Sequence, residues 1–399
     1  MSVEVTLQVN ETFSSKYKEG YPLIHKEALK NSKGLDSEGT IVTLVDENKK
    51  FIGKGYYGRQ NKGYGWVISY NRNESFNQAF FKQKLAAAIQ ARSSFYQSTD
   101  TTAFRVFNGE GDGIGGFTLE YFDGYYLFNW YSKGIYTFQP LIIEALKELV
   151  EFKGIYEKKR FHTGGQYIED DEFVAGERGE FPLIVKENDV NFAVYFNEGA
   201  MVGVFLDQRN VRQTILEKYS KGRTVLNTFS YTGAFSVFAA LGGAAKTTSV
   251  DLANRSLNKT IEQFSMNEID YEAQDIIVED VFKYFKYAVK KELTFDTVIL
   301  DPPSFARSKK FTFSASKGYK NLLKEAIAIT ENGGTIVAST NCSSFGMKKF
   351  KGFIKDAFKE MKMNYQLLEE FSLPSDFKTI KEFKEGDYLK VVFIKKIDK

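Results

Sequence analysis

The chain has 399 residues, of which 43% are hydrophobic and 26% are charged, with a formal net charge of +3 at neutral pH. This composition is ordinary for a soluble globular protein, and the length exceeds what one hydrophobic core usually supports, so we expect two or three domains. One cysteine cannot form an intramolecular disulfide, and two histidines far apart in the sequence give no metal-ligand cluster, so we predict no metal site. Neither a signal peptide nor a run long enough to span a membrane is recognisable, which favours a cytoplasmic protein that contacts no membrane.

Two domains are predicted before residue 191. Residues 1–72 form a β-rich domain, because the strand-like runs Thr40–Asp46 and Phe51–Gly55 flank a turn. Residues 73–190 form a middle α+β domain that would contact the substrate. Its expected elements are a helix over Phe76–Tyr96, strands within Phe117–Tyr131, a helix over Pro140–Phe152 and strands within Phe181–Phe196.

The first domain carries a basic and aromatic stretch over residues 49–72, which holds six cations and no acid. Cations hold phosphates and aromatic faces stack unpaired bases, so this mixture suits single-stranded RNA. The alternative is a β-domain with a basic face whose aromatic residues form its core. The RNA contacts that we expect here are Lys54, Arg59 and Lys62, with Phe51, Tyr56, Tyr57, Tyr64, Trp66 and Tyr70 interleaved.

From residue 191 to residue 399, strands and helices alternate, which predicts an α/β, Rossmann-like domain with a doubly wound sheet. The expected strands are Val225–Leu226, Thr248–Val250, Asp275–Val278, Asp296–Leu300, Thr335–Ser339 and Leu389–Ile394. The expected helices are Ala234–Leu241, Asn254–Met266, Gly318–Thr330 and Met347–Met361. Polar residues follow three of these strands, and in open α/β sheets ligands bind at the carboxyl ends of strands.

A nucleoside-binding motif is expected after the first of these strands. The loop Asn227–Gly233 joins a strand to a helix, where backbone N–H groups can approach a polar ligand. Asp251 ends the next strand at the spacing typical of an acid that accepts ribose hydroxyls, and Asp280 is placed to accept from an adenine amino group. The loop has one glycine rather than three, which disfavours a dinucleotide and favours S-adenosylmethionine. Each acid, taken alone, is equally compatible with a solvated residue at a strand end.

Asp301-Pro302-Pro303-Ser304-Phe305 closes a second strand. Two consecutive prolines fix the backbone and restrict Asp301 to extended geometry, which suits a carboxylate that must hold a flat base in one orientation. The basic residues that follow could guide a nucleic-acid backbone, and the alternative is a rigid turn with a basic surface loop. Those expected to contact RNA are Arg307, Lys309 and Lys310.

The only cysteine, Cys342, follows a third strand and is a candidate nucleophile. A free cysteine more often behaves as a small buried hydrophobic residue. The polar ends of the neighbouring strands favour the catalytic interpretation over that one.

These motifs resemble the class I S-adenosylmethionine-dependent methyltransferases, and specifically the large-subunit rRNA cytosine-5 methyltransferase I family. The matching strings are Gly203–Arg209 with Arg212, Leu226–Phe235, Ser249–Asp251, Asn267, Asp280–Phe282, Asp301–Phe305, Gly318–Lys320 and Asn341–Ser343. Upstream, Phe104–Gly113 resembles the middle domain of that family, and residues 1–72 resemble its PUA RNA-binding domain. The similarity covers nearly the whole chain.

The resemblance implies a methyltransferase that forms 5-methylcytidine in large-subunit (23S) rRNA or its precursor, as a monomer or a homodimer. Cys342 would add to C6 of the cytosine and Asp301 would hydrogen-bond the base edge. Some cytosine-5 enzymes carry a second cysteine beside the double proline, where this chain has Ser304. The residues implied to bind the cofactor are Phe205, Asp207, Gln208, Arg209, Asn227, Phe229, Ser230, Tyr231, Thr232, Gly233, Asp251, Leu252, Asn267, Asp280, Val281, Asp301 and Pro302.

Three other interpretations stay open. An N-methyltransferase acting on an exocyclic amine would use a related double-proline motif and would need no cysteine. A non-catalytic RNA-binding assembly factor would have a vestigial cofactor pocket, which the intact acids and Cys342 disfavour. A nicotinamide dehydrogenase is disfavoured by the missing glycines.

Overall fold

The computed structural model describes residues 4–60, 63–161, 172–199, 201–307 and 312–398. The chain divides into two compact units. The first unit consists of Met1–Val185, Val194–Val202 and Ser375–Gly386, and the second unit consists of Lys186–Ala193, Gly203–Pro374 and Asp387–Lys399. The segments predicted as the first two domains thus share one compact unit, and the exact domain boundaries stay a prediction.

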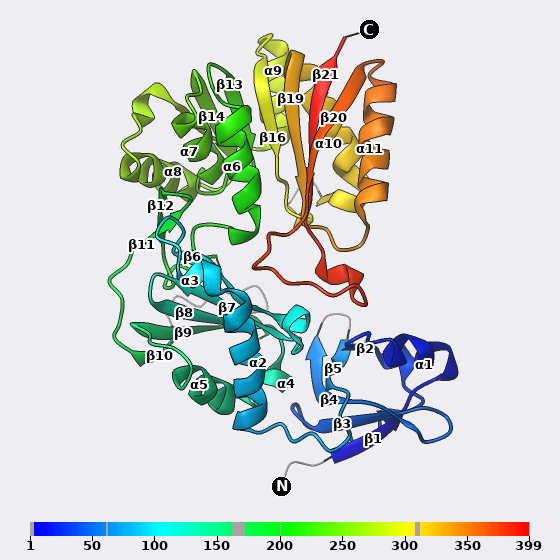
Figure 1. Cartoon of the computed structure of the whole chain (residues 1–399). Coiled ribbons are helices and arrows are strands. Elements are labelled where there is room, and N and C mark those ends of the chain that lie inside the picture. The colour runs from blue at the N-terminus through cyan, green and yellow to red at the C-terminus, as the bar shows by residue number, and fades with distance from the viewer. Residues whose placement is uncertain (1–3, 61–62, 162–171, 200, 308–311, 399) are drawn as a thin grey trace. The chain divides into compact units, whose positions relative to one another are not determined.

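The first unit begins with a five-stranded sheet in the order β1-β3-β4-β5-β2 (Figure 1). Its elements are β1 (Glu4–Gln8), α1 (Glu11–Lys18), β2 (Leu23–Ile24), β3 (Ile41–Val45), β4 (Phe51–Gln60) and β5 (Gly63–Ser69). The predicted strands around the turn at residues 46–50 are confirmed. Tyr56, Tyr57 and Trp66 are buried in the hydrophobic core, whereas Tyr70 is exposed. Three of the six interleaved aromatic residues therefore stabilise the core of the domain.

A second five-stranded sheet of the first unit has the order β10-β9-β8-β7-β6. Its strands are β6 (Ala103–Asn108), β7 (Phe117–Phe122), β8 (Tyr125–Trp130), β9 (Gly154–Lys159) and β10 (Phe173–Gly176), and its helices are α2 (Gln78–Ala91), α3 (Ser93–Tyr96), α4 (Lys133–Tyr136) and α5 (Gln139–Lys147). The helix predicted over Phe76–Tyr96 is present as two helices, α2 and α3, which are separated at Arg92. The guanidinium of Arg92 is buried and forms a bidentate ion pair with Asp112. Helix α5 also ends five residues earlier than predicted.

The segment Ser375–Gly386 belongs to the first unit although it follows β20 of the second. Asp376 is fully buried: its backbone oxygen accepts hydrogen bonds from Arg92, and its carboxylate accepts one from the backbone N–H of Arg105. The Arg105 guanidinium stacks 4.3 Å from the ring centroid of Phe377. These contacts hold the segment, with its run Asp376-Phe377-Lys378, within the first unit.

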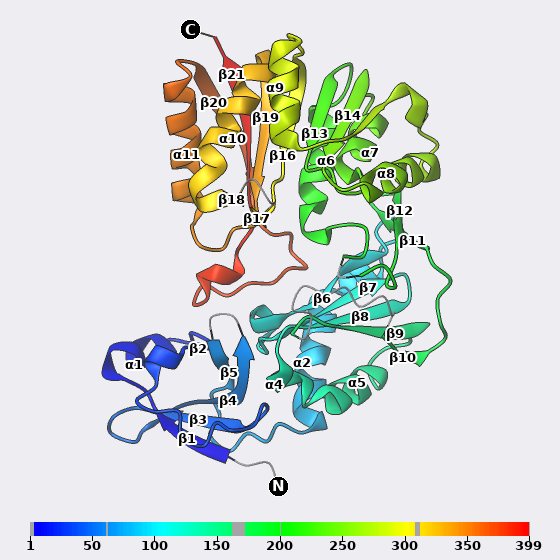
Figure 2. The same cartoon turned by 180° about the vertical axis from the view of Figure 1, so that it is seen from behind.

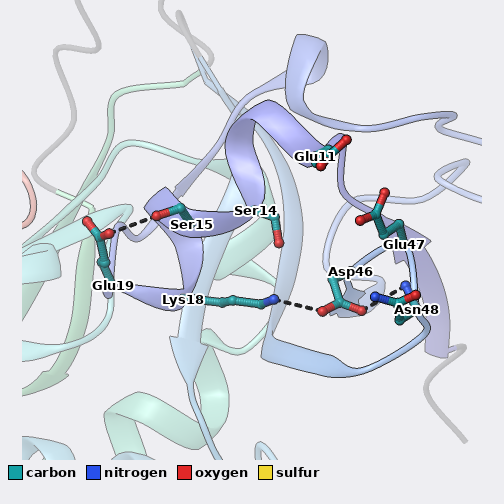
Figure 3. A pocket seen from close by; sticks show the side chains of 8 residues that line it. All are labelled: Glu11, Ser14, Ser15, Lys18, Glu19, Asp46, Glu47 and Asn48. Carbon is teal, nitrogen blue, oxygen red and sulfur yellow. Dashed lines mark hydrogen bonds and ion pairs between the residues drawn. The ribbon is translucent and has the colours of Figure 1, made fainter.

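A polar pocket lies between α1 and the β3–β4 turn (Figure 3). Its lining residues are Glu11, Ser14, Ser15, Lys18, Glu19, Asp46, Glu47 and Asn48. Lys18 Nζ pairs with Asp46 Oδ2 at 2.7 Å. The lining contains three further acids, Glu11, Glu19 and Glu47, and no further cation, so it carries a surplus of negative charge. Such a lining repels phosphate, so we assign no RNA contact to this pocket.

The second unit is built on a seven-stranded sheet in the order β15-β14-β13-β16-β19-β21-β20. Its strands are β13 (Thr224–Thr228), β14 (Lys246–Asp251), β15 (Asp275–Val278), β16 (Phe295–Leu300), β19 (Thr330–Thr340), β20 (Asn364–Phe371) and β21 (Lys390–Ile397). The first five are parallel to one another, and β21 pairs antiparallel with both β19 and β20. The predicted doubly wound α/β sheet is confirmed, with the addition of an antiparallel hairpin at one edge.

Helices cover both faces of this sheet because its buried strands are apolar on both sides. The helices are α6 (Arg209–Lys218), α7 (Ala234–Leu241), α8 (Arg255–Met266), α9 (Val281–Lys290), α10 (Ala315–Ile329) and α11 (Met347–Glu360). Leu300 and Ala338 pack on one face with α9, α10 and α11 (Figure 2), and Ile299 and Val337 pack on the other with α6 and α7. The shorter pairs β11 (Leu183–Glu187) with β12 (Val190–Val194), and β17 (Phe305–Arg307) with β18 (Thr312–Ser314), complete the strands of the described residues.

Among the described α-helices and strands of the second unit, five were not predicted: α6, α9, β17, β18 and β20. Helix α9 reads as a dense aromatic run, Val-Phe-Lys-Tyr-Phe-Lys-Tyr, in which helical and strand periodicity are hard to separate. Among the described residues, no helix combines the length and the apolar character needed to cross a membrane.

Candidate active site

Three loops that carry the predicted site follow the carboxyl ends of adjacent parallel strands. Strand β13 lies between β14 and β16, so the strand order reverses at the β13–β16 pair, which is where open α/β sheets bind ligands. Strand β19 lies beside β16 with Leu300 opposite Ala338, so Asp301 and Ser339 are the next residues on the two strands. The sheet thus brings the loops 229–233, 301–304 and 341–346 to one edge.

The loop after β13 is tightly wound. Phe229 and Tyr231 have φ angles of 55° and 51°, in the left-handed region that side-chain-bearing residues rarely adopt. Gly233 has a φ of 80°, and a Cβ there would lie 2.5 Å from Thr260 Cγ2, so only glycine fits. Thr232 Oγ1 donates to the backbone oxygen of Gly203. Strained backbone of this kind is typical of ligand-binding loops.

Asp251 organises this loop from the end of β14. Its Oδ2 accepts from the backbone N–H of Tyr231 and its Oδ1 accepts from that of Ala253, both at 2.9 Å. Each oxygen keeps a further lone pair for a hydroxyl group. Leu252, the next residue, is exposed. The carboxylate is therefore oriented by the backbone and still able to accept from a ligand.

Two other predicted cofactor residues have local structural partners. Asp280 is the N-cap of α9, where its Oδ1 accepts from the backbone N–H of Lys283, and Val281 is buried behind it. The Asn267 amide pairs with the backbone N–H and oxygen of Asn191 in β12, and it also donates to Gln263. These contacts give Asn267 a role in holding β12 against α8.

The Phe205–Arg209 turn meets the acid that follows β16. Gln208 Nε2 donates to Asp301 Oδ1 at 3.2 Å and to Ser339 Oγ at 2.8 Å. Gln208 Oε1 is buried and has no hydrogen-bond partner among the described residues. Asn227 Oδ1, at the end of β13, is a second such acceptor. Two unpartnered buried acceptors fit a ligand that brings its own donors.

A buried ion pair anchors the same turn. The Arg212 guanidinium donates twice to the Glu187 carboxylate at 2.7 Å, and both side chains are almost fully buried. Arg212 also donates to the backbone oxygen of Phe205, whose ring lies 5.3 Å from that of Tyr231. The arginine was noticed in the sequence as part of a motif, but its carboxylate partner could not be inferred from spacing.

Burial raises the pKa of Asp301 to about 6, although hydrogen bonds from Ser339 and Gln208 oppose this shift. Asp301 Oδ1 receives both of those bonds. No described residue hydrogen-bonds to Oδ2. The carboxyl group therefore offers one oxygen to a ligand and titrates within the range of ordinary assay buffers.

Cys342 lies in the loop that follows β19, as predicted, and is 9% exposed. Its thiol lies 3.1 Å from Ser344 Oγ, and the residue packs within the apolar cluster that includes Phe345. Asn341, its neighbour, accepts a hydrogen bond from Ser304 Oγ, which joins this loop to the double-proline loop. The thiol is thus beside the acid loop and largely covered.

The predicted RNA contacts divide into two groups. Lys54 forms an ion pair with Glu4, and the backbone N–H of Arg59 donates to Glu38 while its guanidinium donates to Tyr57. The side chains of Lys62, Arg307, Lys309 and Lys310 lie outside the described residues.

Comparison with known protein families identifies the family of this chain. A family model described as S-adenosylmethionine-dependent methyltransferase matches residues 162–383, and a model described as a PUA-like domain matches residues 7–70. The chain belongs to the S-adenosylmethionine-dependent methyltransferases, with S-adenosylmethionine as its methyl donor and a PUA-like domain at residues 7–70. The family predicted from the sequence motifs is thereby confirmed.

Relatives align over nearly the whole chain. YwbD of Bacillus subtilis (strain 168), provisionally named a ribosomal RNA large subunit methyltransferase, is 63% identical over 392 residues, which cover 98% of this chain and 99% of YwbD. Ribosomal RNA large subunit methyltransferase I of Pseudoalteromonas translucida (strain TAC 125) is 30% identical, with coverage of 99% and 100%. The crystal structure of SMU.776, a provisionally assigned methyltransferase complexed with SAH, matches with a TM-score of 0.90 at 37% identity, with coverage of 98% and 100%.

Proposed function

We propose that this methyltransferase modifies a base of large-subunit rRNA, and that the base is cytosine, methylated at C5. The observation that carries the proposal is the position of Cys342 and Asp301 after adjacent parallel strands, joined by the Ser304–Asn341 hydrogen bond. The names of the relatives support the rRNA substrate. The PUA-like domain and the basic residues of the chain are the surfaces that we assign to RNA.

The cofactor is proposed to lie over the end of β13. Asp251 would accept the ribose hydroxyls, and the loop 229–233 would surround the ligand with backbone donors. Gln208 Oε1 and Asn227 Oδ1 would accept from its ammonium group, which satisfies two buried atoms that lack partners in the protein. S-adenosylmethionine supplies the methyl group in an electrophilic form.

Replacement of Asp251 by asparagine is expected to weaken S-adenosylmethionine binding about tenfold to a hundredfold. The single amide oxygen cannot accept from both Tyr231 and Ala253 and also from the ribose. Isothermal titration calorimetry measures the effect. Asp275→Asn, at the opposite end of the neighbouring strand β15, is the matched control. An Asp251→Asn affinity equal to that of the control would contradict the ribose assignment.

The proposed chemistry begins at the thiol. The Cys342 thiolate adds to C6 of cytosine, which breaks the C5–C6 π bond and makes C5 nucleophilic. Asp301 Oδ2 hydrogen-bonds the base edge during this step. C5 then takes the methyl group as the sulfonium–methyl bond of the cofactor breaks. A base, to which no residue is assigned, takes up the C5 proton, and the electron pair returns to the ring as the C6–sulfur bond breaks. Ser304 occupies the place of the second cysteine, so no thiol assists this release.

Asp301→Asn is expected to remove methylation while making the protein more stable at alkaline pH. The native pKa of Asp301, about 6, exceeds the usual value of 3.8, so its ionisation destabilises the folded state above pH 6, and protonation relieves this cost towards pH 4. The amide should add about 1–2 kcal/mol to the free energy of unfolding at pH 8 and less at pH 5. Urea denaturation at both values checks this, and a variant that is less stable at pH 8 would refute it. The same pKa predicts the pH dependence of catalysis. Below pH 6 Asp301 becomes protonated, so the wild-type methylation rate should fall there.

A second candidate is methylation of a base nitrogen, which needs no nucleophile. Two observations favour it. Cys342 is 9% exposed within an apolar cluster, whereas Phe305, just beyond the double proline, is 62% exposed and available to stack on a flat base. Asp301 Oδ2 would then hydrogen-bond the base that is methylated.

Trapping with 5-fluorocytidine separates the two candidates. Fluorine at C5 cannot leave as a proton does, so the C5 mechanism stalls with sulfur bonded to C6. Wild-type enzyme with S-adenosylmethionine and fluorinated rRNA should form an adduct that survives denaturing electrophoresis, and Cys342→Ala should form none. If the enzyme methylates ordinary rRNA but forms no adduct with the fluorinated rRNA, the result favours a base nitrogen as the methyl acceptor.

A further inference from the structure

Lys390, the first residue of β21, is a buried cation in the second unit. Only 4% of its surface is exposed, and among the described residues no carboxylate lies within ion-pairing distance of its Nζ. Burial lowers the pKa of this ammonium group, while electrostatic interaction with Asp387 and Cys342 raises it. Lysine is almost never fully buried unless it is paired, and Lys390 is paired with backbone oxygens rather than with an acid.

The ammonium contacts the loop 341–346 at Cys342 and Phe345, and it also contacts Tyr388. Lys390 Nζ donates to the backbone oxygen of Cys342 at 3.1 Å and to that of Tyr388 at 2.6 Å. It also lies 5.7 Å from the ring centroid of Phe345. The lysine therefore holds the loop 341–346 from the side of β21, while Ser304 holds it from the side of the double proline.

The same strand end reaches the turn that carries the acid. Tyr388 donates from its hydroxyl to Asp207 Oδ2 at 2.8 Å, and the next residue, Gln208, donates to Asp301. Lys390 and Tyr388 thus join the Cys342 loop to the Phe205–Arg209 turn through a continuous set of hydrogen bonds.

We propose that Lys390 is a positioning residue of the methyl-transfer site, which fixes the Cys342 loop and keeps a positive charge beside the thiol. This inference rests on the proposed role of Cys342. A thiol that only filled an apolar cluster would gain nothing from a desolvated cation held against its own backbone oxygen. A nucleophilic thiolate would gain both orientation and charge stabilisation.

The single cysteine allows this charge to be measured without RNA. Iodoacetate is anionic and iodoacetamide is neutral, so the ratio of their alkylation rates at Cys342 reports positive charge near the sulfur. In Lys390→Met this ratio should fall about threefold or more, and Lys390→Arg should keep it near the wild-type value. Single-turnover methylation should fall at least about tenfold in Lys390→Met, with KM for rRNA within about twofold and partial recovery in Lys390→Arg.

An unchanged alkylation ratio in a folded Lys390→Met protein would overturn the inference. If that variant does not fold, Lys390→Gln takes its place, and Tyr388→Phe, which breaks only the link to Asp207, should slow methylation and leave the ratio unchanged. The two proposals fail separately. If Cys342→Ala still methylates rRNA, the proposed nucleophilic role of Cys342 is wrong, and the alkylation test of Lys390 can still be carried out. If Cys342→Ala is inactive but the alkylation ratio is unchanged in Lys390→Met, only the proposed role of Lys390 is wrong.

Discussion

Replacement of Cys342 by alanine is expected to lower the methylation rate at least about a thousandfold, because the chain has no other cysteine to supply the thiolate of the C5 mechanism. The affinity for S-adenosylmethionine should stay within about twofold, since no cofactor contact is assigned to the thiol. Single-turnover transfer of a labelled methyl group measures the rate, and calorimetry measures the affinity.

Ser344→Ala is the matched control for this experiment. It removes the hydroxyl that lies 3.1 Å from the Cys342 thiol and leaves the thiol in place, so activity should fall by less than about tenfold. A Cys342→Ala enzyme that retains the activity of the Ser344→Ala control would exclude the covalent route. Cys342 would then serve only to fill the apolar cluster, and a base nitrogen would be the methyl acceptor.

Replacement of Arg212 by methionine is expected to destabilise the second unit by about 3–5 kcal/mol, because it leaves the buried Glu187 carboxylate unpaired. Both tryptophans, Trp66 and Trp130, belong to the first unit. Their fluorescence therefore follows the first unit, while far-ultraviolet circular dichroism follows helices of both. In urea, the dichroism of Arg212→Met should begin to change well before its fluorescence.

The double variant Arg212→Met with Glu187→Leu separates the two roles of the arginine. Stability should largely recover, since an apolar pair can replace a buried ion pair of similar volume. Cofactor affinity should be lower than in the wild type in both the single and the double variant, because the backbone oxygen of Phe205 lacks its donor and the Phe205–Arg209 turn is no longer held. A single variant with the wild-type dichroism transition would show that the pair contributes little to folding.

The sheet of the second unit could be predicted because its pattern is local. Buried parallel strands are short apolar runs, and each is followed by polar residues such as those after Thr228, Leu300 and Thr340. The order of those runs was enough to place Asp301 and Cys342 on neighbouring strand ends. The cofactor class followed from the single glycine and from Asp251.

The contacts that complete the site could not be predicted, because they join residues far apart in the sequence. Lys390 approaches Cys342 across 48 residues, and Tyr388 approaches Asp207 across 181. The register of the antiparallel strand β21 against β19 decides both contacts, and nothing in the local composition encodes that register. The sequence prediction extended helix α2 past Arg92 for a related reason. Arg92 pairs with Asp112, which lies in another element.

Nucleoside mass spectrometry of large-subunit rRNA, incubated with this enzyme and isotope-labelled S-adenosylmethionine, tests the central claim most directly. The proposal predicts labelled 5-methylcytidine with wild-type enzyme and none with Cys342→Ala. Label in a methylated purine, or in a cytidine methylated on nitrogen, would contradict it.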